Sequence, residues 1–175
     1  LEPGLRIRAT ADDLPAVLDT GLAGSDIAVA LNAAFAADGL IIEIDPGIVV
    51  ERPIHLAFVT TAATPFAMFT RSLLALGEGA AATLLETHEG PDRSDYQVNT
   101  ALRLQVGDRA RLDHIKLTSE GASALHIATV LTEVGAGAVY REFGITTGGS
   151  VVRNQLFLKL AGEGTEASVH QASLL

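Results

Sequence analysis

Cysteine and tryptophan are absent from the 175 residues, and methionine occurs once. Without cysteine, the chain can form no disulfide and offers no thiolate as a metal ligand or as a nucleophile. Lysine and arginine are also sparse: there are 12 of them against 21 acidic residues, for a net charge of −9. Because a nucleic-acid backbone is bound by clustered basic side chains, we expect no nucleic-acid partner.

Long apolar runs and a secretory signal are missing as well. No run approaches the ~18 uninterrupted apolar residues of a membrane helix, so we expect no membrane partner. Leu1 opens the chain with neither a starting Met nor a basic segment ahead of an apolar one, and we expect a fragment without a secretory signal. The apolar share of 48% predicts a packed globular core.

A glycine-marked pattern returns at a nearly constant interval from about residue 74 to residue 175. Its first glycine falls at Gly77, Gly107, Gly135 and Gly162, and further glycine turns lie midway. A meander folded into a sandwich or barrel fits the strand spacing, but a period of about 28 residues favours a solenoid, in which equivalent residues stack one turn later. We therefore predict an all-β fold, a parallel β-helix. Strands are expected at 40–44, 48–50, 54–59, 66–76, 81–87, 97–105, 110–118, 124–133, 138–146, 151–160 and 165–173.

Two regions follow from this pattern, a helical lead-in at 1–38 and a β-helix core at 39–175 that we expect to continue past the end of the chain. Acidic Asp12 and Asp13 before an apolar stretch, with Gly21 after it, predict a short helix in the lead-in.

A second, three-turn helix is predicted with Ser25 or Asp26 as its N-cap and Gly39 just past its end. Ile27, Leu31 and Phe35 recur at four-residue spacing and so lie on one face. We expect that face to be buried and the helix to cover the open end of the solenoid, because terminal repeats need a cap.

The glycine turns do not have the pattern of phosphate-binding loops. Such a loop opens a helix, whereas each turn here precedes a predicted strand, and no Gly-Lys-Ser or Gly-Lys-Thr occurs. Gly149-Ser150 also lacks the Gly-x-Ser-x-Gly pattern of a serine nucleophile. We interpret the glycines as structural corners and predict no catalytic and no cofactor-binding residue.

Histidine is the residue type that most directly raises the question of a metal site. His114 and His126 lie on neighbouring predicted strands and, with Glu86, Asp113 or Glu120, would make a two-histidine, one-carboxylate set. Isolated strand histidines are more often hydrogen-bonded or surface residues, so we predict no metal site and keep only His114, His126 and Glu86 as weak candidates. The five histidines are His55, His88, His114, His126 and His170.

A polar loop at 88–95 is flanked by carboxylates. Glu86, Glu89, Asp92 and Asp95 are compatible with the paired carboxylates of a β-helix polysaccharide lyase or hydrolase, which must be held on rigid elements. A loop rich in Asp, Ser, Gly and Pro is more simply a solvated turn. The polysaccharide enzyme therefore remains the alternative function.

Several segments, in their order and spacing, resemble the SufB/SufD family of the SUF iron–sulfur cluster assembly system. The likeness spans about residues 28 to 175 and includes 30–35, 38–39, 46–47, 53–56, 71–74, 84–86, Asn99, 110–117 and 153–154.

The resemblance implies a right-handed parallel β-helix in a cytoplasmic complex, where SufB and SufD pair through their β-helices and each carries a SufC ATPase. SufB builds the nascent cluster on a cysteine, so a chain without cysteine is similar to SufD. The expected role is that of a non-enzymatic scaffold fragment with no cofactor of its own, with iron or a cluster in the full complex. No functional residue of the family can be assigned here by position. An exposed strand edge also predicts self-association.

Overall fold

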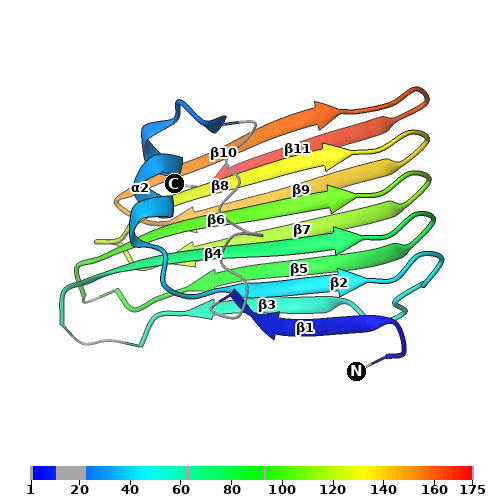
Figure 1. Ribbon diagram of the computed structural model, residues 1–175. Coiled ribbons are helices and arrows are strands. Elements are labelled where there is room, and N and C mark those ends of the chain that lie inside the picture. The colour runs from blue at the N-terminus through cyan, green and yellow to red at the C-terminus, as the bar shows by residue number, and fades with distance from the viewer. Residues whose placement is uncertain (1, 11–22, 62–63, 93, 175) are drawn as a thin grey trace.

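The computed structural model shows a β-solenoid of about five turns and describes residues 2–10, 23–61, 64–92 and 94–174. Each turn contributes one strand to each of two sheets, and these strands pair in parallel within each sheet, whereas the first strand of the chain pairs antiparallel (Figure 1). The predicted fold class is therefore confirmed. In spatial order, one sheet contains β1 (Leu5–Ala9), β2 (Leu40–Ile44), β4 (Phe66–Leu76), β6 (Tyr96–Val106), β8 (Leu125–Val134) and β10 (Val151–Leu160). The other contains β3 (Ile54–Val59), β5 (Ala81–Glu89), β7 (Arg111–Glu120), β9 (Val139–Gly148) and β11 (Glu166–Leu174).

The repeat shortens along the chain. Tyr96 pairs with Phe66, 30 positions earlier, whereas Leu125 pairs with Gln97, 28 earlier, and with Val151, 26 later. The turns shorten in the connections that lead from the second sheet back to the first. These connections contain six residues at 90–95, four at 121–124 and two at 149–150. The predicted period of about 28 is thus a mean over turns of unequal size.

The repeated glycines form the corners at the opposite end of the turns. The Gly107 amide donates to the Leu76 carbonyl at 3.0 Å, and the Gly135 amide donates to the Val106 carbonyl at 2.8 Å. A Cβ on Gly107 would lie 2.7 Å from that Leu76 oxygen, so a side chain does not fit between the stacked corners. These contacts confirm the interpretation of the glycines as structural corners.

β1 corrects the prediction that residues 1–38 are helical. Its LRIRA segment alternates apolar and basic residues, the period of a strand, and it pairs antiparallel with the edge of β2. Arg6 and Arg8 both form ion pairs with Glu43 of β2, at 3.8 and 3.6 Å. The short helix predicted near Asp12 lies outside the described residues.

α2 (Ile27–Phe35) confirms the predicted helix and its N-cap, but the helix ends at its C-cap, Ala36, and not just before Gly39 as predicted. Asp26 accepts hydrogen bonds from the amides of Ala28 and Val29 at 2.9 and 3.1 Å. The predicted position was wrong, however, because α2 lies across the outer face of β4, β6 and β8 and not over the end of the solenoid (Figure 1).

The predicted buried face of α2 was wrong as well. Ile27 is 81% exposed and Phe35 is 61% exposed, whereas Asn32 is fully buried. The Asn32 amide nitrogen donates to the carbonyls of Thr70 and Asn99, and its oxygen accepts from Arg71 Nε at 2.9 Å. These polar contacts, together with small neighbours that let the helix approach closely, determine which face is buried. The buried residues of α2 are Ala28, Val29 and Asn32.

The solenoid interior is apolar toward the glycine corners. Leu74 and Leu104 of one sheet and Leu84 and Leu112 of the other have no exposed surface and belong to one aliphatic cluster. Buried aliphatic side chains of this kind supply most of the free energy that holds two sheets together. Further along the same strands the interior changes character and becomes polar.

Candidate functional site

The inner face of the second sheet changes from aliphatic to ionisable within single strands. In β5, Leu84 is followed on the same face by Glu86 and His88, because strand side chains alternate with a period of two. In β7, His114 and Lys116 likewise follow a buried leucine. Glu86 and Lys116 are paired in register. All four ionisable side chains are buried, so their partners must lie within the solenoid.

Glu86 is the centre of the first group. Its carboxylate accepts from His88 Nε2 at 2.6 Å and from His114 Nε2 at 2.9 Å, and Lys116 Nζ lies 3.8 Å away. Lys116 also donates to the Asn154 side chain of the facing sheet at 3.0 Å. Burial by itself raises the pKa of Glu86, but the Lys116 charge and the two histidine hydrogen bonds outweigh it and hold that pKa well below its usual value.

Glu120, at the end of β7, is the centre of the second group. One oxygen accepts from His126 Nδ1 at 2.8 Å and the other accepts from the Tyr96 hydroxyl at 2.7 Å. The Tyr96 oxygen in turn accepts from the Gly121 amide. Burial and the bond to Glu120 raise the pKa of Tyr96 to about 12, which keeps this phenol protonated.

The two groups meet where His88 of β5 faces His126 of β8 across the interior. Their ring centroids are 4.7 Å apart in an edge-to-face arrangement, and Phe58 stacks on His88 at 4.6 Å. Within the described residues, His88 Nδ1 and His126 Nε2 have no hydrogen-bond partner. One ligand atom each of His88, His126 and Glu120 lie within 4.8 Å of one another.

The predicted candidate residues are distributed differently from the expectation. Glu86 and His114 are in contact, but His126 pairs with Glu120 in place of Glu86. His88, which the prediction placed in the polar loop, is a buried residue of β5. The alternation that begins at Leu84 already indicates that His88 faces the interior, but the turn residues after His88 suggested that the strand ended before it.

The other two histidines and three of the carboxylates near the polar loop lie outside these two groups. His55 contacts the Thr87 hydroxyl at 2.9 Å, and exposed His170 contacts Ser168 at 3.0 Å. Glu86 points into the interior, whereas Glu89, Asp92 and Asp95 are exposed. The carboxylates near the loop therefore do not form the pair that glycoside chemistry requires, and the polysaccharide alternative is not favoured.

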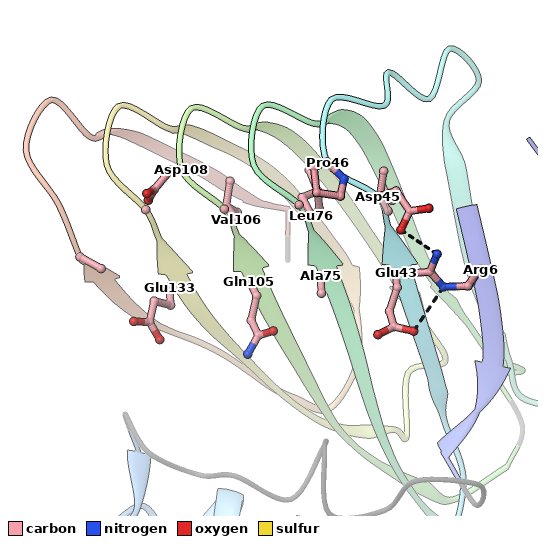
Figure 2. Close-up of a pocket in the computed structure, with 15 residues that line it drawn as sticks. Arg6, Glu43, Asp45, Pro46, Ala75, Leu76, Gln105, Val106, Asp108 and Glu133 are labelled. Carbon is pink, nitrogen blue, oxygen red and sulfur yellow. Dashed lines mark hydrogen bonds and ion pairs between the residues drawn. The ribbon is translucent and has the colours of Figure 1, made fainter. Parts of the chain in front are cut away.

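A surface groove along the strand ends near the glycine corners carries a second group of carboxylates (Figure 2). Those of Glu43 and Asp45 face Arg6, which lies 3.8 and 2.6 Å from them. Asp108 accepts from a backbone amide at 2.8 Å, and Glu133 pairs with Lys159 at 2.7 Å. Each of these carboxylates has a structural partner, so we do not assign a site to the groove.

Comparison with known proteins places the fold in a family. Residues 58–175 match the family model described as SUF system FeS cluster assembly, SufBD core domain. The chain belongs to the SufBD family. A relative in Synechocystis sp., described as an iron–sulfur cluster assembly SufBD family protein, is 24% identical over 161 residues, which cover 87% of this chain and 36% of the relative. The SufBD chain thus spans about a third of the length of the relative it matches.

The matched region contains every strand from β4 onward and therefore the whole interior polar network of the SufBD chain. α2, β1 and β2 precede it. Among the described residues, no helix has the length and apolar character needed to cross a membrane.

The interior network predicts a pH dependence of stability for the metal-free SufBD chain. Burial lowers the pKa of His126 to about 4, while an unfolded histidine titrates near 6.5. Between these values the unfolded chain binds more protons, so the stabilisation is complete above pH 6.5 and is lost as the pH falls toward 4. We expect His126 to account for a loss of about 3 kcal/mol in the free energy of unfolding over this range.

Urea unfolding between pH 7.5 and 4.5 in the presence of a chelator measures this loss. The His126→Gln variant provides the comparison, because buried carboxylates contribute a loss of the same sign at lower pH. Equal slopes of unfolding free energy against pH for the two proteins would contradict the assignment to His126.

Proposed function

We propose that the chain forms the core of a SufD-like scaffold subunit, which pairs with a SufB-type subunit in a cytoplasmic SUF complex. A SufC-type ATPase would supply the energy of the cycle, and iron or a nascent cluster would be cargo of the complex. The observation that carries the proposal is the match of residues 58–175 to the SufBD core domain, over a solenoid with the expected turns.

The composition of the chain favours a SufD-like role over a SufB-like one. A cluster assembled on cysteine needs a thiolate, and this chain contains none. Cluster-bearing sulfur ligands would therefore come from outside these 175 residues, which supply a stiff surface and act as a scaffold and not as an enzyme.

The outer face of the second sheet offers a surface for such a partner. Ile115 and Phe143 are neighbours in register on β7 and β9, and they are 37% and 46% exposed; Leu117, on the same face of β7, is 37% exposed. Adjacent exposed apolar side chains of this kind are typical of protein contacts. We place the SufB-type subunit on this patch, which we define as Ile115, Leu117 and Phe143.

Co-purification tests both parts of the proposal. The full-length protein, expressed with its SufB- and SufC-type subunits, is expected to be recovered as a complex, and Phe143→Glu should reduce recovery at least tenfold. Ile27→Glu, on the exposed face of α2, is the matched control and should leave recovery unchanged. Absence of any complex would contradict the proposed SufD-like role, whereas a complex unaffected by Phe143→Glu would contradict only the patch.

Self-association through a strand edge remains a separate prediction. Sedimentation of the purified chain across a concentration series is the measurement, and a strict monomer at high concentration would contradict it.

A further inference from the structure

We propose that His88 Nδ1 and His126 Nε2 bind one divalent first-row transition-metal ion inside the solenoid, with Glu86 and Glu120 as the carboxylates behind the two rings. The two ligands come from β5 and β8, so the site joins both sheets. The inference rests on the interior geometry and is independent of the assignment of partners above.

The hydrogen bonds of the two histidines determine their tautomers. A carboxylate can only accept, so His88 Nε2 carries the proton that it donates to Glu86, and His126 Nδ1 carries the proton that it donates to Glu120. In the neutral rings, His88 Nδ1 and His126 Nε2 then hold lone pairs. Both atoms are buried, and no donor reaches either of them among the described residues. Two buried lone pairs without donors, on rings in contact, require a cation or another donor between them.

The carboxylates behind the rings match the usual surroundings of metal-bound histidine. A ligating imidazole almost always donates its second ring N–H to a carboxylate or carbonyl, which fixes the tautomer and raises the basicity of the ligand. Glu86 and Glu120 stand in this position for His88 and His126. The Tyr96 hydroxyl holds Glu120 in turn at 2.7 Å.

The contact between the two rings allows one ion to bridge them. The ring centroids of His88 and His126 are 4.7 Å apart. Bonds of about 2.1 Å in a tetrahedral arrangement place two ligand atoms roughly 3.4 Å apart, a separation that a rotation of the His126 ring can set while Phe58 holds the ring plane of His88. The remaining coordination positions would be available to water or to a cargo ligand.

The donor set also selects the class of ion. Imidazole ligands suit Fe(II), Co(II), Ni(II) or Zn(II), whereas Ca²⁺ and Mg²⁺ prefer oxygen ligands only. The carboxylates of Glu86 and Glu120 stand behind the ion-bound rings, and the Lys116 ammonium, 3.8 Å from Glu86, offsets one of these two negative charges. His114 does not belong to the site, because both of its ring nitrogens already have partners, Tyr140 at 3.3 Å and Glu86 at 2.9 Å.

Cobalt titration of the chelator-treated chain, with Co²⁺ alone as the probe, tests the site. We expect visible d–d bands that saturate at one ion per chain, with slow release because His88 and His126 are fully buried. Glu120→Gln and His126→Ala should each weaken Co²⁺ binding at least tenfold. His170→Ala removes an exposed histidine and is the control that should bind as the parent does.

A second measurement covers the case in which the variants do not fold. In the unaltered protein, ¹⁵N spectra of the histidine side chains should show two neutral rings of opposite tautomer, and added Zn²⁺ should shift His88 Nδ1 and His126 Nε2 in particular. Absence of both cobalt bands and zinc shifts would overturn the proposal in favour of a bridging water or proton. Equal cobalt affinity in the parent and in folded His126→Ala would overturn it as well. Neither result would bear on co-purification with SUF subunits.

Discussion

Replacing Glu86 by alanine is expected to lower the free energy of unfolding by about 3–5 kcal/mol. The change leaves the Lys116 ammonium, 5% exposed, without its nearest counter-charge. It also removes the acceptor for two buried imidazole N–H groups, those of His88 and His114. Urea unfolding at pH 7.5 measures the loss. Glu89→Ala changes an exposed carboxylate of the same strand and should alter the unfolding free energy by less than about 0.5 kcal/mol.

A double variant shows whether the loss has the stated cause. Glu86→Leu with Lys116→Met replaces the buried ion pair by apolar side chains and should be more stable than Glu86→Leu alone, because no uncompensated charge remains. The electrostatic explanation would fail if Lys116→Met gave no recovery. It would also fail if Glu86→Ala stayed within about 1 kcal/mol of the parent.

Replacing Asn32 by alanine should cost about 2–4 kcal/mol and loosen α2 from the sheet. The variant removes one acceptor from the buried Arg71 guanidinium and the donor that the Thr70 and Asn99 carbonyls share. Burial lowers the pKa of Arg71 but leaves it charged, so a lost acceptor is costly. Urea unfolding and the rate of proteolytic cleavage within residues 27–35 measure the two effects.

Ile27→Ala is the matched control for Asn32→Ala. Ile27 is 81% exposed on the same helix, so its removal should change stability by less than about 0.5 kcal/mol. If Ile27→Ala proved as costly as Asn32→Ala, the apolar face of α2 and not its polar face would hold the helix in place.

The solenoid could be predicted from the sequence because its signals are local and repeated. A glycine corner excludes a side chain at the same point of every turn, as the Gly107 contact with Leu76 shows, so the period appears directly in the sequence. The N-cap at Asp26 was equally predictable, since the cap involves only adjacent residues.

The packing of α2 could not be predicted in the same way. The spacing of Ile27 and Phe35 indicates an apolar face, but a contact with residues up to 67 positions away, between Asn32 and Asn99, determines which face is buried. β1 was missed for a related reason, because its partner strand β2 follows only after α2 in the sequence.

The candidate site was predictable only in part. Once a turn of 30 residues is assumed, Glu86 falls beside Lys116 in the same sheet, and this pairing could have been derived from the repeat. The meeting of His88 with His126 could not, because it depends on how two different sheets face each other across the interior. No sequence period reports that distance.

The unequal turn lengths have a consequence for how this protein can be altered. The corners at 77–80, 107–110 and 135–138 have equal length, whereas the return connections contract from six residues to four and then two. The cross-section therefore tapers on one side only, and each turn fits only neighbours of nearly its own circumference. Corner segments should therefore be exchangeable between turns. A whole turn moved to another position in the solenoid would not match the circumference of its new neighbours, so the sizes of the turns fix their order along the axis.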